Sequence, residues 1–138
     1  MALHADDISL NTIIGIDSSL VGNLRINGLV RIDGDVDGDI ETTGKIIIGE
    51  KARIRGSITA KDVVTGGVIR GDIIASESIH LLSTALVFGD VIAKKVQIEQ
   101  NVILQGYCVS VKNEEEYLAI KKQWNDMKAI TSSSLNKN

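Results

Sequence analysis

Four aspartates at alternate positions are the residues of this chain whose type and spacing could bind a metal ion: Asp33, Asp35, Asp37 and Asp39. Residues two apart point to the same side of a strand, and carboxylates gathered in that way could hold Ca²⁺. The series occurs only once, whereas a repeat that binds calcium carries its acids in every turn. We therefore interpret these aspartates as solvated strand and turn positions, and we predict no metal site and no cofactor.

The second candidate for chemistry is the single thiol, Cys108. A catalytic thiol needs a nearby base, and the only histidines are His4 and His80. His4 lies in the N-terminal tail, and the alternation around His80 turns its side chain towards solvent. We therefore interpret Cys108 as a small buried hydrophobe and predict that the protein is not an enzyme. A reduced thiol without a signal peptide favours the cytoplasm, and no apolar run approaches the ~20 residues needed to span a bilayer.

A glycine repeat shows which elements must position these residues. Glycines at positions 22, 38, 56, 71, 89 and 106 are spaced by 16, 18, 15, 18 and 17 residues. Between them, pairs of small or apolar residues recur two apart, as in Ile46 and Ile48 or Ile79 and Leu81. Three such pairs fill each repeat, and a spacing of two is the strand period. The pattern predicts a β-solenoid of about six turns, with three short strands per turn and a narrow aliphatic bore.

Composition agrees with this interpretation. The chain is 43% hydrophobic but only 3% aromatic, and it contains no proline, so no ladder hydrogen bond is lost. The formal net charge is −3 with both signs interspersed, and no basic run is present, so we predict no nucleic-acid partner.

The chain divides into four regions. Residues 1–11 are expected to form a flexible tail, 12–111 the β-helix, 112–131 an amphipathic helix and 132–138 a disordered tail. The helix is predicted from Tyr117, Ile120, Trp124 and Met127, which recur every three or four residues after a capping-box start. Two roles remain open for it: a cap folded over the last turn, or a helix that binds a partner or another chain and leaves the coil end free. We favour packing against the protein's own coil or a neighbouring subunit over an external partner.

Several motifs resemble the bactofilin family. They are the opening Thr-Ile-Ile-Gly at 12–15, the Arg-Ile-Asp-Gly-Asp-Val-Asp-Gly-Asp-Ile run at 31–40, Ala-Arg-Ile-Arg-Gly-Ser-Ile at 52–58, Val-Ile-Arg-Gly-Asp-Ile at 68–73 and Thr-Ala-Leu-Val-Phe-Gly-Asp-Val at 84–91. The resemblance implies an all-β, right-handed parallel β-helix that assembles end to end into non-polar filaments without a nucleotide. It also implies a cytoskeletal scaffold for cell shape, cell-wall organisation or motility, with cell-wall or motility proteins as further partners.

Two departures from the family pattern concern the ends of the chain. The tail at 1–7 carries two acids and no Lys or Arg, so anionic lipid should repel it and we expect no direct membrane binding; any location at the inner membrane face would depend on partners. Leu104 stands where the family tends to have Phe near its C-terminal interface. In the incomplete first turn we expect Ile14, Ile16 and Leu20 to point inward. We expect polymer contacts through two sets of residues: Thr12, Ile14 and Ile16 at the N-terminal end, and Val102, Leu104 and Cys108 at the C-terminal end.

Other known uses of a β-helix fit this sequence less well than a scaffold. A pectin-lyase-type enzyme has longer turns with loop insertions, which this chain lacks. A left-handed acyltransferase helix needs hexapeptide steps and a catalytic histidine; the uneven turns of 15 to 18 residues argue against the first, and the presence of only two histidines argues against the second. The closest alternative is a capped solenoid that does not polymerise and acts as an adaptor for a protein partner.

Overall fold

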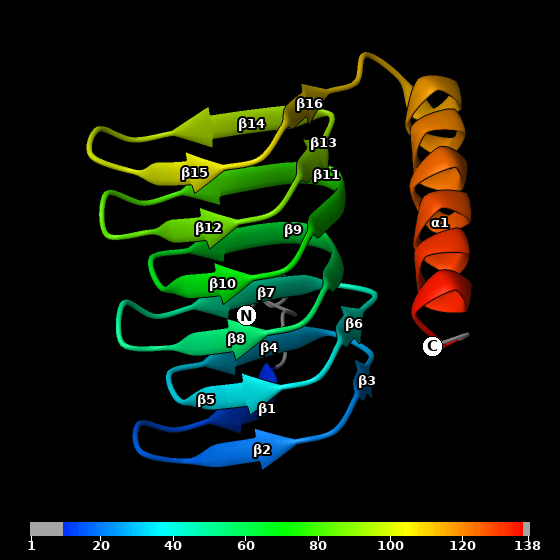
Figure 1. Cartoon of the computed structure of the whole chain (residues 1–138). Helices are drawn as coiled ribbons and strands as arrows, with labels where there is room; N and C mark the ends of the chain where they lie inside the picture. Colours follow the sequence, from blue (N-terminus) through cyan, green and yellow to red (C-terminus); the bar gives the residue numbers. More distant parts are fainter. Residues whose placement is uncertain (1–9, 137–138) are drawn as a thin grey trace.

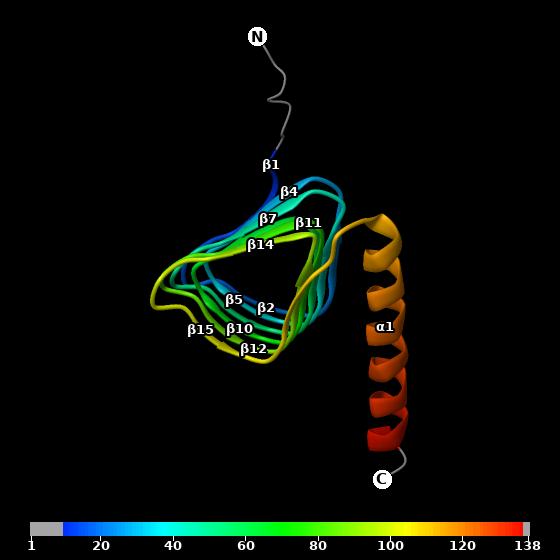
Figure 2. The ribbon, with the colours of Figure 1, turned by 90° about the horizontal axis from the view of Figure 1, so that it is seen from above.

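The structure is a computed structural model that describes residues 10–136, with side chains up to Met127. The chain winds into a right-handed parallel β-solenoid of six turns followed by one helix (Figure 1). Viewed down its axis, the solenoid is a triangular prism, and the helix stands beside it (Figure 2). The predicted fold class is therefore confirmed.

Each turn contributes one strand segment to each of three faces. Face 1 contains, in order along the axis, β1 (Leu10–Ile14), β4 (Leu29–Ile32), β7 (Lys45–Ile48), the end of β9 (Ile58–Thr65), the end of β11 (Ile73–Leu81) and β14 (Lys95–Ile98). β9 and β11 are long because each continues around a corner from face 3 to face 1, which joins those two faces into one ten-stranded sheet.

Face 2 is a separate six-stranded parallel sheet. It contains β2 (Ser19–Val21), β5 (Asp35–Asp37), β8 (Arg53–Arg55), β10 (Val68–Arg70), β12 (Leu86–Phe88) and β15 (Ile103–Gln105). Face 3 contains β3 (Leu24–Ile26), β6 (Ile40–Thr42), the starts of β9 and β11, β13 (Val91–Ala93) and β16 (Cys108–Ser110).

Like residues stack on like residues inside the prism. On face 1, Val30, Ile46, Val63 and Ile79 pair in register from turn to turn, and each is at most 1% exposed. The buried hydroxyls are satisfied locally: Thr42 donates to the Gly28 carbonyl at 2.6 Å, and Thr65 accepts from the Gly67 amide at 3.2 Å. The bore is therefore filled by aliphatic side chains without an unpaired hydroxyl at these two positions.

The repeating glycines form a column at the corner between faces 2 and 3. Gly71 has a φ of +157°, and a Cβ there would overlap the carbonyl oxygen of Gly56 one turn below. Several residues that follow these glycines add side-chain hydrogen bonds between successive turns at this corner, and they form a second ladder. Asp72 Oδ1 accepts the Asp90 amide at 2.8 Å, and Asp90 Oδ1 accepts the Tyr107 amide at 2.9 Å. Glycine therefore recurs at this corner for two reasons: its backbone conformation has a positive φ, and the adjacent turn leaves no room for a Cβ.

Helix α1 (Glu114–Asn136) follows the last turn. Its start resembles the predicted capping box: Asn113 Oδ1 accepts the Glu116 amide at 2.8 Å, and Glu116 Oε2 accepts the amide of Lys112, the residue before the N-cap, at 3.3 Å. The helix runs past residue 131, where the sequence analysis ended it, since no Gly or Pro interrupts residues 114–136. The coil also begins at Leu10 rather than at residue 12, and the tail prediction for 1–9 lies outside the described residues. α1 is not long and apolar enough to cross a membrane.

Candidate polymer interfaces

The N-terminal edge of the solenoid consists of β1, β2 and β3, each paired on one side only within residues 10–136. Thr12 and Ile14 stack over Val30 and Ile32, and they remain half-exposed because no turn within residues 10–136 lies beneath them. The edge therefore presents unpaired backbone together with the lower surface of an aliphatic core.

Ile16 departs from the sequence expectation that it points inward. It is 59% exposed, in a corner turn closed by the Ser18 amide donating to the Gly15 carbonyl at 3.1 Å. Asp17 adopts a φ of +69° in that turn, which interrupts the alternation carried over from β1. Leu10, Ile13 and Val21 are also exposed on the first turn, and the sequence analysis did not assign them to the interface.

The C-terminal edge consists of β14, β15 and β16, which pair only with the turn below them among the described residues. Val102 and Leu104 pack half-buried against the core, and Cys108 stacks on Val91. The expectation that Cys108 is buried is wrong, because the open edge leaves it exposed. Desolvation by its neighbours nevertheless raises the pKa of the Cys108 thiol.

Helix α1 covers neither edge. It turns back from the C-terminal end and runs along the outside of face 3 (Figures 1 and 2). Tyr117 is 4% exposed, and Ile120 and Trp124 are half-buried against Ile74 and Ile92. Met127 belongs to the same stripe but is 65% exposed. The capped-solenoid alternative needed this helix over the last turn, and the structure places it on the flank.

Polar contacts fix the helix to face 3 at two points. Trp124 Nε1 donates to Asp72 Oδ2 at 2.6 Å. Lys94 Nζ lies 3.0 Å from both Glu77 Oε2 and Glu114 Oε2, and hydrogen bonds first to Glu114 and then to Glu77 raise the lysine pKa. Because the folded state favours protonated Lys94, this contribution is complete below the unfolded pKa of about 10.4 and is lost as pH rises through the folded pKa.

Ile74 and Ile92 are the helix-binding residues that the sequence analysis missed. Both point outward from face 3, yet they are 0% and 4% exposed because α1 covers them. The available signal was a break in alternation: Ile73-Ile74-Ala75 and Val91-Ile92-Ala93 are continuously apolar, whereas Leu24-Arg25-Ile26 and Ile40-Glu41-Thr42 alternate. A strand buried on both sides carries such a run.

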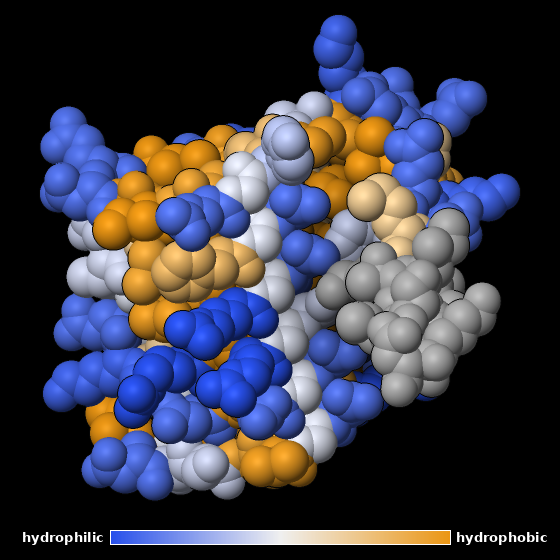
Figure 3. All heavy atoms as spheres, in the orientation of Figure 1, coloured by the Kyte–Doolittle hydropathy of each residue, from blue (hydrophilic) through white to orange (hydrophobic). Residues whose placement is uncertain are grey.

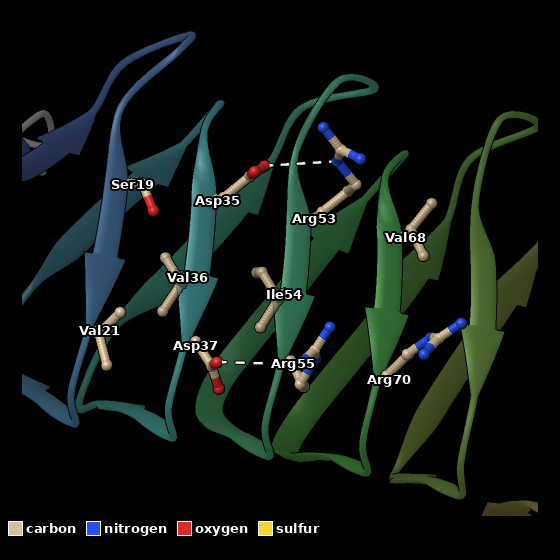
Figure 4. A pocket seen from close by; sticks show the side chains of 10 residues that line it. All are labelled: Ser19, Val21, Asp35, Val36, Asp37, Arg53, Ile54, Arg55, Val68 and Arg70. Atoms are coloured by element: carbon tan, nitrogen blue, oxygen red, sulfur yellow. Dashed lines mark ion pairs between the residues drawn. The ribbon is translucent and has the colours of Figure 1, made fainter.

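The aspartates considered as metal ligands are paired with basic or backbone groups instead. Asp35 Oδ1 lies 3.5 Å from Arg53 Nε, Asp37 Oδ2 lies 3.9 Å from Arg55, and Asp33 Oδ2 accepts from Arg31 Nε at 2.8 Å. Figure 4 shows the acidic strand β5 beside the arginine strand β8, in a shallow groove of about 420 Å³ on face 2. The described residues include no group of three His, Cys, Asp or Glu side chains arranged to hold a metal.

The thiol and the histidine are placed apart. Cys108 lies on face 3 and His80 on face 1, where His80 Nε2 is 3.0 Å from Glu99 Oε2. Glu99 also accepts the Ser83 amide at 3.2 Å. His80 therefore belongs to a contact between successive turns, and it is not positioned to activate Cys108.

Comparisons with known proteins agree with this architecture. The bactofilin profile, described as polymer-forming cytoskeletal, matches residues 12–109. Among curated proteins, Bactofilin BacO of Myxococcus xanthus is 30% identical over 101 residues, covering 64% of this chain and 80% of BacO. Bactofilin BacP of the same organism is 25% identical over 96 residues, covering 70% of this chain, and the matched region spans only 40% of BacP.

Solved structures give the same result. A point mutant of the Thermus thermophilus bactofilin matches with a TM-score of 0.61 at 32% identity, covering 66% of this chain and all of that one. The cytoskeletal bactofilin BacA matches with a TM-score of 0.64 at 27% identity, covering 73% of this chain and 96% of BacA. The cryo-EM reconstruction of Thermus thermophilus bactofilin double helical filaments matches with a TM-score of 0.61 at 27% identity, covering 73% of this chain and all of that one. The family profile matches nearly the whole six-turn solenoid, whose first and last turns pair on one side only among the described strands, and this match shows that the chain belongs to the bactofilin family of polymer-forming cytoskeletal proteins.

Proposed function

We propose that this chain polymerises through both solenoid edges, N-terminal edge to N-terminal edge and C-terminal edge to C-terminal edge. The filaments would be non-polar and would need no nucleotide. They would serve as a cytoplasmic scaffold for cell shape, cell-wall organisation or motility, with a structural rather than a catalytic role. Cell-wall or motility proteins are the proposed further partners.

The observation that carries the proposal is that both edges of the solenoid leave strand backbone and core side chains accessible. Within residues 10–136, each edge exposes strand backbone that pairs on one side only, together with half-exposed core residues such as Ile14 at one end and Leu104 at the other. An edge of this kind is a template for another strand, and soluble proteins usually block it. Here α1, the one element available to block the C-terminal edge among the described residues, packs elsewhere.

The proposed contact residues are those at the two open ends of the inward columns. At the N-terminal edge they are Thr12 and Ile14, with Ile16 at the adjoining corner. At the C-terminal edge they are Val102, Leu104 and Cys108. Contacts between like edges are isologous, so two kinds of junction alternate and the filament has no direction. Filaments of a relative from Thermus thermophilus support polymerisation by this fold.

Single charge insertions at each edge test the proposal. Ile14→Arg and Leu104→Arg each place an unpaired charge in one stacking surface, at a cost of several kcal/mol. We expect each variant to stop at dimers through its intact edge and the double variant to be monomeric. Analytical ultracentrifugation and negative-stain electron microscopy measure both. Gln105→Arg is the matched control, because Gln105 is the exposed, outward neighbour of Leu104 on β15 and its variant should still form filaments. Filaments that survive both single substitutions would contradict the proposal.

A further inference from the structure

The outer surface of face 2 is apolar over its last turns and charged below them. Val68, Leu86 and Ile103 are in register on β10, β12 and β15 and point outward, with Phe88 beside Leu86 on the same strand. Ile103 is 56% exposed, and the other three are half-buried. Figure 3 shows this hydrophobic surface over the upper strands of the face, above a charged lower part. We call these four residues the face 2 row.

Face 3 carries an equivalent row in the same turns, and there a helix covers it. Ile74, Ile92 and Val109 are in register on β11, β13 and β16, and α1 packs on them. Among residues 10–136, no element packs over the face 2 row, which lies on the open front of the solenoid in Figure 1. An apolar row of this kind on the surface is typical of an interaction site.

The spacing of the strands explains why a helix fits such a row. Successive turns of the solenoid are about 4.8 Å apart and one turn of an α-helix rises about 5.4 Å, so each helical turn advances by nearly one strand. On α1, Tyr117 lies about 10.5 Å from Trp124 along the helix axis, and the stripe between them covers β11, β13 and β16. The face 2 row has the same dimensions on β10, β12 and β15. It therefore matches a helix with apolar side chains at positions i, i+3 or i+4, and i+7.

The charges beside the row indicate that the helix is acidic. The guanidinium carbon of Arg70 lies 5.9 Å from the ring centroid of Phe88, and Arg70 is in register with Arg55. Arg53 and Arg55 each pair with an aspartate of β5, whereas Arg70 has no carboxylate partner among the described residues. The groove on face 2 reaches the row at Val68 and Arg70 (Figure 4). A carboxylate one turn beyond the apolar side chains of a bound helix would meet Arg70 there.

We propose that the face 2 row binds an amphipathic helix of another protein, with aliphatic or aromatic side chains on the row and an acidic side chain paired with Arg70. The row points outward, whereas the proposed end contacts use inward residues such as Leu104, so a filament leaves the row accessible. A single copy carries the whole row, and the inference therefore does not require filaments. Three strands about 4.8 Å apart and three residues long cover about 150 Å². A stable interface buries about 800 Å² on each partner, so one helix should bind weakly and reversibly.

Two synthetic peptides of about 18 residues, or five helical turns, serve as probes. Both are fluorescein-labelled amphipathic helices with leucine at every third or fourth position and no tryptophan. The polar side carries glutamate in the Glu probe and lysine in the Lys probe. Fluorescence anisotropy with the full chain measures both affinities. We expect about tenfold tighter binding of the Glu probe, because Arg70 pairs with it, although the net charge of −3 by itself favours the Lys probe.

Matched variants separate the apolar contact from the charged one. Leu86→Gln removes the central apolar contact without adding charge and should weaken both probes about tenfold. Val64→Gln is its control, because Val64 is an outward, half-buried aliphatic residue on face 1. Arg70→Glu should weaken the Glu probe and strengthen the Lys probe, a reversal that loss of structure would not produce. Lys95→Glu, at an exposed position of β14 on face 1, should leave the order of the two probes unchanged.

Three results would overturn the inference. Absence of Glu-probe binding, or equal binding by wild type and Leu86→Gln, would show that the row takes no helix. A red shift of the emission of Trp124, the only tryptophan, that Leu86→Gln does not prevent would show that the probe displaces α1 from face 3. Vesicles of phosphatidylglycerol and phosphatidylethanolamine that bind wild type but not Leu86→Gln, without probe binding, would assign the row to lipid. Filaments are measured separately by sedimentation, so their absence in wild type would contradict the proposed function alone.

Discussion

Trp124 donates its indole N–H to Asp72 Oδ2 at 2.6 Å, while Asp72 Oδ1 accepts the Asp90 amide at 2.8 Å. One carboxylate therefore joins α1 to the corner ladder that links successive turns. Trp124→Phe keeps an aromatic ring on Ile74 and removes the donor. Because hydrogen bonds to charged groups contribute about 1.5–3 kcal/mol and this one is partly exposed, we expect helix docking to weaken by about 1 kcal/mol. Faster amide hydrogen exchange along α1 would show this, and Met127→Ala, at an exposed position of the stripe, should leave exchange unchanged.

Removal of the helix tests its position on the flank. Truncation after Lys112 deletes α1 but leaves both edges of the solenoid as they are. We expect filaments to form at a similar critical concentration, and stability to fall because Ile74 and Ile92 become exposed. Sedimentation and thermal unfolding measure these effects. Longer filaments at a lower concentration would instead identify α1 as an inhibitor of the C-terminal edge.

The inward register predicts opposite sensitivities for adjacent residues. Ile54 is 2% exposed in the bore, so Ile54→Ala should lower the free energy of unfolding by about 2–5 kcal/mol. Arg53 points outward and pairs with Asp35 at 3.5 Å in solvent, so Arg53→Ala should cost no more than about 1 kcal/mol. Urea unfolding in the monomeric background of the Ile14→Arg and Leu104→Arg double variant measures both. A larger effect at Arg53 would show that the register is wrong by one residue.

A comparison of two corner glycines distinguishes two costs of a Gly→Ala substitution, namely backbone strain and steric overlap with the adjacent turn. Gly71 and Gly22 both have positive φ, at +157° and +134°. A Cβ on Gly71 would overlap the carbonyl oxygen of Gly56, whereas a Cβ on Gly22 would meet no atom within 4 Å. Gly22→Ala should therefore cost only the conformational strain, about 1 kcal/mol, and Gly71→Ala should cost distinctly more. Equal losses in urea unfolding would show that stacking between turns does not restrict this corner.

Cys108 reports on the C-terminal edge. Desolvation raises the pKa of its thiol, so the thiol form predominates at neutral pH and alkylation by iodoacetamide should be slow there. The rate should rise with pH as the thiolate forms. Assembly through the C-terminal edge should protect Cys108 further, and Leu104→Arg should remove that protection. Equal alkylation rates in filaments and in the Leu104→Arg dimer would place Cys108 outside the junction.

The sequence predicts the solenoid well because its constraints are local and repeated. Spacing alone identifies the inward columns, such as Val30, Ile46, Val63 and Ile79, because every turn packs an aliphatic side chain at the same position. Predictions failed where the repeat stops. Ile16 was expected to point inward but lies in a corner turn, and Cys108 was expected to be buried but lies at an open edge.

The position of α1 shows a second limit of prediction from sequence, namely that the surface on which a helix packs is not specified by the helix alone. Tyr117, Ile120 and Trp124 identify one apolar stripe, but a stripe does not specify the surface that it covers. That information lies fifty-two residues away from Trp124, at Asp72, and in the outward isoleucines nearby. Ile74 and Ile92 could have been recognised as breaks in strand alternation. The sequence alone does not decide whether α1 packs on the C-terminal edge or on the side of the solenoid, because both surfaces carry aliphatic residues that a helix could cover.

The triangular stack of turns also has a mechanical consequence. The backbone hydrogen bonds between successive turns run along the solenoid axis on all three faces. Tension along a filament therefore loads the three ladders of a turn in parallel, and separating two turns requires breaking them together. In the proposed filament, the junctions between chains would carry the same tension without a covalent link. A stretched filament should thus rupture between subunits before any subunit unwinds, so that it breaks into pieces able to rejoin.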